Sequence, residues 1–292
     1  MQSKKEVDTE GLFKAGLLLG IFSIFSIQLG EFIAGSAGFL TGIIISSVVN
    51  AAVYLFGDRW ILLIYRAQRL SAQEVPELFE ILNKICSRAN LPLPKLYFMA
   101  TASPNAFAIG VTPEQSSIVV TQGMVELLNR EELEGVFAYH LAQIERRSTF
   151  PGVVAAVFAS GLMNIVTLFR WMFLVGAGTS QKQEESQNPL VMLVASAIIP
   201  FSALIVRSAI SPAREWKADE ASARITQNSL YLASALRKVD VLAKQRPLLQ
   251  AQPASAHLFM INPLIPGRYH DLFKTHTSIE DRIVRLEKLA DF

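Results

Sequence analysis

The chain has 292 residues, of which 51% are hydrophobic, and its mean hydropathy is +0.34. These values are high for a soluble domain and typical of a protein divided between lipid and water. A net charge of +2 gives no reason to expect a nucleic-acid partner. The single cysteine, Cys86, excludes an internal disulfide framework and agrees with a cytoplasmic body.

Four long apolar runs predict membrane-spanning helices. They cover residues 12–34, 37–56, 153–175 and 190–210. Each is close to the ~20 residues that cross a ~30 Å hydrocarbon core. Buried core helices are the alternative, with more weight for the last two runs than for the first two. The first run is too long for a cleaved signal peptide, and a second run follows it at once.

The basic residues predict an orientation in the membrane. They gather at the same end of each hairpin of spans, at Lys4, Lys5, Arg59, Arg66, Arg69, Arg207 and Arg214. The tip at 34–37 has none, and the loop at 176–188 has only Lys182. By the positive-inside rule, both termini and the polar body lie in the cytoplasm, against the lipid bilayer.

The rest of the chain predicts a mostly helical α+β body. Three short strands are expected at 95–99, 106–109 and 117–121, where apolar residues are separated by turn residues. Helices are expected at 71–89, 122–129, 130–147, 212–227, 229–244 and 279–289, and a loop at 246–266. Thr277 is expected to cap the last helix. The domain prediction is a transmembrane hairpin at 1–57 and a body at 58–292, interrupted by a second hairpin at 151–210.

One predicted helix carries an altered metal-binding motif. Residues 131–147 read EELEGVFAYHLAQIERR. Zinc peptidases of the gluzincin type place H-E-x-x-H on such a helix, after an E-L-x-x-V-x-A run. Tyr139, His140 and Gln143 stand at the three positions where His, Glu and His belong.

Further motifs follow in a fixed order along the chain. They are PKLY at 94–97, PNAFAIG at 104–110, IVVTQG at 118–123, EWKAD at 215–219, NPL at 262–264, LFKTH at 272–276 and IEDRI at 279–283. With the apolar spans between them, this order resembles the HtpX-like membrane zinc metallopeptidases, relatives of the CAAX prenyl proteases. The resemblance implies a zincin-like peptidase fold with its cleft facing the membrane. It also implies a role in the quality control of membrane proteins.

The same resemblance assigns roles to individual residues. Asn105, with Ala106 and Phe107, would line the cleft and hold the substrate backbone. Glu215 would be the third zinc ligand and Asp219 its supporting carboxylate. His276 and Arg282 would support the site and its oxyanion.

The chemistry of the altered motif predicts that zinc is not held. A catalytic zinc needs three protein ligands and an open position for water. The phenol of Tyr139 has a reference pKa of about 10 and is a poor ligand at neutral pH, and zinc seldom uses an amide such as that of Gln143. Only Glu215 remains as a ligand, so no cofactor is predicted. We expect Tyr139, Gln143, His140 or Arg282 to form hydrogen bonds with the retained carboxylates instead.

Three functions remain open from the sequence. The first is a membrane-anchored pseudopeptidase that binds a polypeptide, or a partner such as a membrane protease, without cutting. The second is an active zinc metalloendopeptidase with an atypical site, for example His140, Glu215 and His276. The third is a structural membrane subunit, which a closed cleft around Asn105 would favour.

Overall fold

The computed structural model describes residues 7–177, 189–209, 211–265 and 276–290. Lys4 and Lys5, which were used for the predicted orientation, lie outside these residues, and so do two further features of the sequence. One is the loop at 178–188 with Lys182, and the other is the first part of the LFKTH motif, at 272–275. Within the described residues, the chain forms two projecting helical pairs and a body built around a small sheet.

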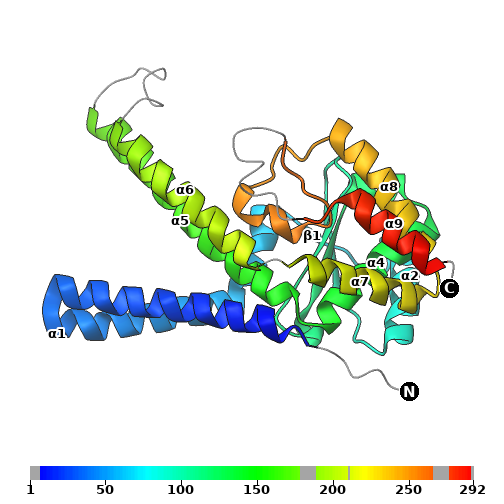
Figure 1. Cartoon of the computed structure of the whole chain (residues 1–292), viewed down its shortest axis with the longest axis horizontal. Helices are drawn as coiled ribbons and strands as arrows, with labels where there is room; N and C mark the ends of the chain where they lie inside the picture. Colours follow the sequence, from blue (N-terminus) through cyan, green and yellow to red (C-terminus); the bar gives the residue numbers. More distant parts are fainter. Residues whose placement is uncertain (1–6, 178–188, 210, 266–275, 291–292) are drawn as a thin grey trace.

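The N-terminal helix α1 (Thr9–Ile64) is a hairpin that projects from the body (Figure 1). Asp8 caps its start, since its carboxylate accepts a hydrogen bond from the Gly11 amide at 3.1 Å. Ala34 and Gly35 leave helical geometry, and Gly35 has a φ of 59°, which favours glycine. The two arms meet where Gly30 faces Gly38, and a Cβ at either position would clash with the backbone of the other. The turn therefore separates the arms at the place expected between the first two apolar runs.

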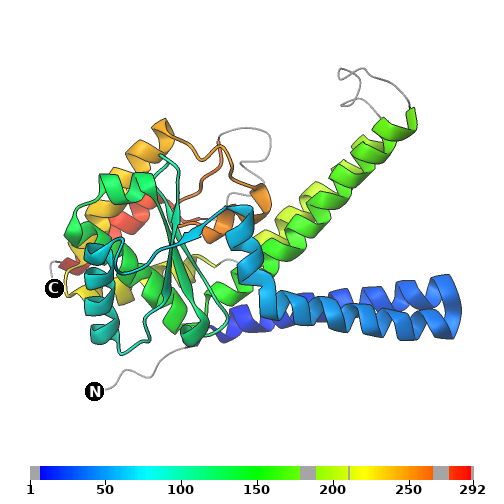
Figure 2. The same ribbon diagram turned by 180° about the vertical axis from the view of Figure 1, so that it is seen from behind.

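A second helical pair leaves the body beside α1. It consists of α5 (Thr149–Ala177) and α6 (Pro189–Ala209), which lie side by side and diverge from α1 (Figures 1 and 2). By length and composition, two described helices can cross a membrane, Thr9–Ile64 and Thr149–Leu168, whereas the apolar segment Ala195–Arg207 is shorter. The count of four spans therefore stays a prediction.

The body contains a sheet of four strands in the order β1-β2-β4-β3. These are β1 (Gln68–Arg69), β2 (Lys95–Met99), β4 (Ser117–Thr121) and β3 (Ala106–Ile109). β2 and β4 are parallel, and the outer strands are antiparallel to their neighbours. The expected count of three strands was wrong, because β1 was not predicted. It has only two residues, and both are exposed. A strand this short has no alternating pattern that a sequence could reveal.

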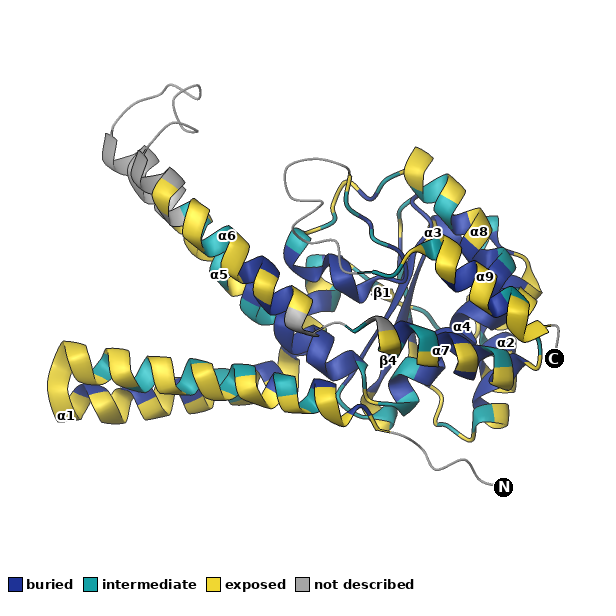
Figure 3. Cartoon of the chain, in the orientation of Figure 1, coloured by how far each residue is buried: buried dark blue, intermediate teal, exposed yellow. Residues whose placement is uncertain are grey.

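Alternating side chains give the sheet two buried faces. Ala106 and Ala108 of β3 pack in the main core with α4 (Arg130–Glu145). Phe107 and Ile109 face the opposite way and pack with Ile61 at the end of α1. Figure 3 shows α2 (Pro76–Ala89), α3 (Gln122–Leu127), α7 (Pro212–Thr226), α8 (Ser229–Gln245) and α9 (Ile279–Ala290) with buried residues in the body. The two short helices are η1 (Pro113–Gln115) and η3 (Pro253–Leu258). The stretch at 246–266 was expected to be loop, but it contains the short helix η3.

The helix α4 crosses the centre of the body and carries the altered motif. Asn129 and Glu132 form a capping box at its start, with hydrogen bonds of 2.9 and 3.0 Å. The Glu132 carboxylate also binds Lys238 of α8 at 2.7 Å. Glu134, on the same helix, binds Lys84 of α2 at 2.8 Å. These contacts fix α4 between its neighbours and so fix the position of the motif.

Candidate functional site

The three motif residues of α4 form hydrogen bonds with one another. The Gln143 amide donates to the Tyr139 hydroxyl at 3.1 Å, and the His140 Nδ1–H donates to the Gln143 carbonyl oxygen at 3.1 Å. Tyr139 and His140 are buried. The expected bonds from these residues to the carboxylates of α7 are therefore not the ones formed. Instead, the motif closes on itself.

Glu215 lies on α7 and binds the start of the C-terminal helix α9. Its Oε1 accepts a hydrogen bond from His276 Nδ1 at 2.7 Å. Its Oε2 accepts from the Thr277 amide at 3.0 Å and from the Thr277 hydroxyl. Thr277 was expected to cap α9, but Ser278 does so, accepting from the Asp281 amide at 3.4 Å. The capping prediction was wrong by one residue. Thr277 and Ser278 are both suitable capping residues, and the sequence does not show that Thr277 binds Glu215 instead.

Asp219, one turn further along α7, holds the guanidinium of Arg282. The Arg282 Nε and Nη2 donate to the two carboxylate oxygens at 2.9 and 2.7 Å. A third donor, Nη1, reaches the Met260 carbonyl at 3.3 Å. The same guanidinium lies 4.7 Å from the centre of the Tyr139 ring. The expected bond from Arg282 to one of the retained carboxylates is thus present, and it goes to Asp219.

Burial and charge set the protonation of these groups. Burial would raise the pKa of the Glu215 carboxyl, but His276, Arg282 and Thr277 together lower it to about 2, so Glu215 is ionised at neutral pH. Burial lowers the pKa of His140 to about 4, so this imidazole is neutral. Burial also raises the pKa of Tyr139, which keeps the phenol protonated. The motif therefore presents neutral groups where an ionised base would belong.

The residues expected to hold a substrate backbone bind a segment of the chain itself. The Asn105 amide donates to the Ile261 carbonyl at 2.8 Å, and the Asn105 carbonyl oxygen accepts from the Ile261 amide at 3.3 Å. The Met260 amide donates to the Ala106 carbonyl at 2.8 Å, and the rings of Phe107 and Phe259 lie 4.9 Å apart. Residues 259–261 therefore cover the outer edge of β3 at Ala106, where an extended peptide would add.

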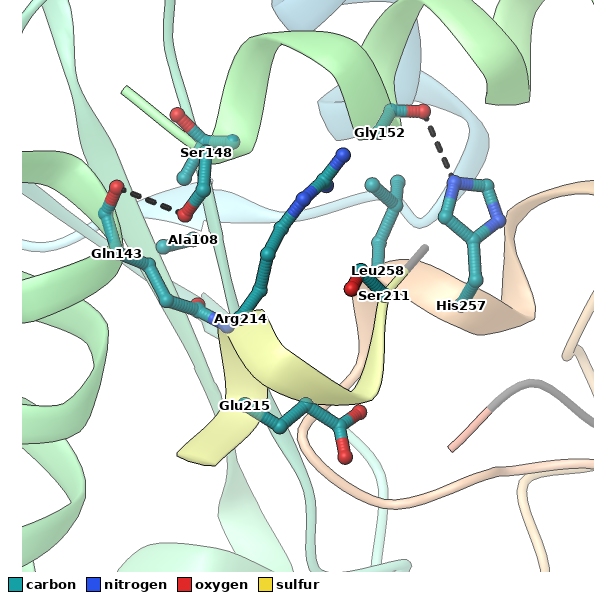
Figure 4. A pocket seen from close by; sticks show the side chains of 10 residues that line it. Ala108, Gln143, Ser148, Gly152, Ser211, Arg214, Glu215, His257 and Leu258 are labelled. Atoms are coloured by element: carbon teal, nitrogen blue, oxygen red, sulfur yellow. Dashed lines mark hydrogen bonds between the residues drawn. The ribbon is translucent and has the colours of Figure 1, made fainter. Parts of the chain in front are cut away.

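Two cavities flank the site. The smaller, of about 60 Å³, is lined by Gln143, Arg214, Glu215 and His257 among others. Figure 4 shows the Arg214 and Glu215 side chains pointing in different directions, and Arg214 Nε binds Asp8 at 2.7 Å. The larger cavity, of about 450 Å³, lies beside Asn105, His276 and Arg282 and has a mixed polar and apolar lining. Its volume is within the usual range for ligand pockets.

The residues present do not fit a zinc ion. Both Glu215 oxygens already accept hydrogen bonds, and the Gln143 amide and Tyr139 hydroxyl bind each other. Among the described residues, no three His, Cys, Asp or Glu side chains are grouped to hold a metal. Of the atypical set, Glu215 and His276 are in contact at 2.7 Å, whereas His140 Nδ1 binds Gln143. The three together are not a metal-holding group among the described residues.

Comparison with known proteins fixes the family. The sequence model described as Peptidase family M48 matches residues 72–290, more than half of the chain. The chain belongs to peptidase family M48. Two curated relatives of this M48 chain are called "Protease HtpX homolog". The one from Syntrophobacter fumaroxidans is 36% identical and the one from Pelotomaculum thermopropionicum 37% identical, each over 95% of this chain, and the alignments cover 99% and 98% of those proteins. The HtpX-like resemblance inferred from the motifs is thereby confirmed.

One solved structure is similar to this M48 chain at low identity. It is the crystal structure of Ste24p from S. mikatae, with a TM-score of 0.46 and 16% identity. The match covers 95% of this chain and 63% of that one, so the chain spans less than two thirds of its length.

The sequence did not indicate three contacts at the site: the hydrogen bonds of Thr277 to Glu215, the ion pair of Arg214 with Asp8, and the packing of residues 259–261 on β3. Arg214 precedes Glu215 directly and could have been noticed from that adjacency. The other two depend on contacts between residues more than 60 positions apart, such as Thr277 with Glu215, and no local pattern indicates them.

Proposed function

We propose that this chain is a membrane-anchored pseudopeptidase of family M48, which binds a polypeptide or a partner protein without cleaving it. The proposal rests on one observation: the residues at the zinc-ligand positions already form hydrogen bonds with other protein groups. Tyr139 and Gln143 bind each other, and Glu215 binds His276 and Thr277. A zinc-bound water and an ionised general base are both needed for this class of hydrolysis. Neither role has a fitting residue here.

Two further features support the proposal, one for binding and one for membrane anchoring. The cavity of about 450 Å³ beside Asn105, His276 and Arg282 offers room for a segment of polypeptide. The apolar arms of α1 and α5 support anchoring in a bilayer. We propose that the chain is multi-pass, with four spans and with the body and both termini in the cytoplasm. We also propose that it takes part in membrane-protein quality control.

Metal content and proteolysis test the proposal. The protein is purified in detergent, its zinc content is measured, and cleavage of a model substrate is assayed with and without chelator. The 36% identical relative from Syntrophobacter fumaroxidans, prepared in parallel, is the positive control. We expect substoichiometric zinc and no chelator-sensitive cleavage. Near-stoichiometric zinc, together with proteolysis that Glu215→Ala abolishes, would overturn the proposal. Loss of such activity in His140→Ala would point to an atypical active site.

A structural membrane subunit is the second candidate, and one observation favours it. The outer edge of β3 is covered at Ala106 by the chain's own residues 259–261, so a peptide cannot add there. Photo-cross-linkers at Lys244, on the rim of the larger cavity, and at Ile44, on the exposed face of α1, separate the two candidates. A polypeptide captured from Lys244 supports the pseudopeptidase. Capture from Ile44 alone supports the structural subunit.

A further inference from the structure

The last two turns of α1 carry an exposed apolar face directly beside the body. Phe56, Arg59, Trp60 and Leu63 fall within roughly a third of the helix circumference at 100° per residue. Trp60 is 54% exposed and Leu63 is 75% exposed. The side chains of these residues continue the outward face of the membrane hairpin to the point where the chain enters the sheet.

The opposite face of the same two turns is packed against protein. Ile61 and Tyr65 are buried in the cluster that includes Phe107 and Phe259. Gly57 is also buried, and a Cβ there would lie 2.9 Å from Val153 of α5. The end of α1 is therefore fixed to the body on one side and uncovered on the other.

The length of the second arm places this face at a definite depth. The arm after Gly35 runs from residue 36 to Ile64. Its 29 residues (64 − 35), at about 1.5 Å each, extend about 44 Å. A bilayer with both headgroup layers is about 40–45 Å thick. If the turn at Gly35 lies in the far headgroup layer, Trp60 and Leu63 lie in the near one.

The chemistry of the face fits that depth. Tryptophan is enriched at the membrane interface because its ring is apolar and its N–H is polar. The Arg59 guanidinium lies 5.5 Å from the centre of the Phe56 ring, so its charge is held next to an apolar side chain. Arg66 follows the helix and is exposed. Apolar side chains flanked by cations complement anionic headgroups, whose phosphates attract Arg.

We propose that the face formed by Phe56, Arg59, Trp60 and Leu63 docks on an anionic phospholipid surface, with Arg59 and Arg66 binding lipid phosphates. The body then rests directly on the membrane instead of standing off from it in water. This inference rests on the membrane anchoring that is part of the proposed function, and it identifies the partner of one surface.

Spin labels at three positions test the docking. Cys86 is the only cysteine and is buried, so labels attach selectively to introduced cysteines. The variants are Ile44→Cys on the arm, Leu63→Cys on the proposed face and Val284→Cys on α9, all at positions at least half exposed. In vesicles of phosphatidylglycerol and phosphatidylcholine, the depth of each label is measured from its collision rates with oxygen, which concentrates in lipid, and with a nickel complex, which stays in water. We expect the labels at Ile44→Cys and Leu63→Cys to collide more often with oxygen, and the label at Val284→Cys to collide more often with the nickel complex.

The outcomes separate this inference from the anchoring. If Leu63→Cys behaves like Val284→Cys while Ile44→Cys stays in lipid, the docking is wrong and the anchoring stands. If Ile44→Cys also favours nickel, the anchoring fails and the docking with it. Disulfide-linked dimers through Leu63→Cys would assign the face to a second copy and overturn the lipid assignment.

The phosphate contacts have a test of their own. In vesicles of phosphatidylcholine alone, the label at position 63 should be more mobile than in vesicles that contain phosphatidylglycerol. The double variant Arg59→Gln/Arg66→Gln should remove that difference. Equal mobility in both lipids would overturn the phosphate contacts.

Discussion

At the scale of single residues, the pair Asp219–Arg282 is the most heavily buried charged contact at the site, with side chains 2% and 1% exposed. Asp219→Asn would leave the guanidinium without a counter-charge in the core. We expect the free energy of unfolding to fall by about 3–5 kcal/mol, the usual cost of breaking a buried pair. Denaturant unfolding in detergent measures the change. The double variant Asp219→Asn/Arg282→Met should be less destabilised than the single one, because no charge is left unpaired. Equal stability of Asp219→Asn and the wild type would contradict this account.

A buried neutral imidazole makes stability depend on pH. Burial lowers the pKa of His140 from 6.5 to about 4 in the folded chain. Between these values the unfolded state binds more protons than the folded state, so stability falls as the pH drops from about 6.5 towards 4. The shift corresponds to about 3 kcal/mol. In His140→Leu, the melting temperature should depend less on pH in this window than it does in the wild type. His257, whose pKa burial also lowers to about 4, remains in that variant, so part of the slope should persist.

At the scale of elements, one polar side chain adds to the backbone bond and the ring contact that join β3 to residues 259–261. Asn105 forms hydrogen bonds with Ile261 in both directions and with the Ala106 amide at 3.0 Å. Asn105→Ala should therefore destabilise the fold by about 1–3 kcal/mol. It should also speed hydrogen exchange of the Met260 and Ile261 amides, which mass spectrometry can follow.

A matched control for this element is Asn129→Ala, which removes the cap of α4 at a cost of about 1 kcal/mol. Its effect on hydrogen exchange should be confined to the first turn of α4. If Asn105→Ala leaves exchange at 260–261 unchanged, the side chain is not what holds the segment.

The elements also show where sequence reasoning succeeds. The strands at 95–99, 106–109 and 117–121 follow from local apolar patterns, and the structure has them at those positions. The covering of β3 by residues 259–261 could not be predicted, because it pairs positions about 155 residues apart and the segment lies in a proline-rich stretch. Similarly, the motif predicted that Tyr139 and Gln143 would not suit zinc, but it could not show that they would bind each other instead of Glu215.

At the scale of the whole molecule, the end of α1 belongs to the core of the body. Tyr65 packs edge-on to Phe259 at 5.1 Å, and its hydroxyl lies 2.7 Å from the Ser255 hydroxyl. Ile61 is fully buried beside it. Removing one large core side chain costs about 2–5 kcal/mol, and whole domains are stable by only about 5–15 kcal/mol. A body without both residues should therefore lose most of its stability.

Two truncations test this, and with it the predicted domain boundary at residue 58. The fragment 58–292 keeps Ile61 and Tyr65, and detergent can cover the apolar face of α5 that α1 leaves. It should unfold cooperatively, at a lower temperature than the full chain because the Asp8–Arg214 ion pair is gone. The fragment 66–292 differs by eight residues and should show no cooperative transition in circular dichroism. The full chain with Tyr65→Ala is the control for the aromatic cluster alone and should fall between the two. Equal folding of both fragments would mean that the end of α1 is a linker, and the boundary would then move to residue 66.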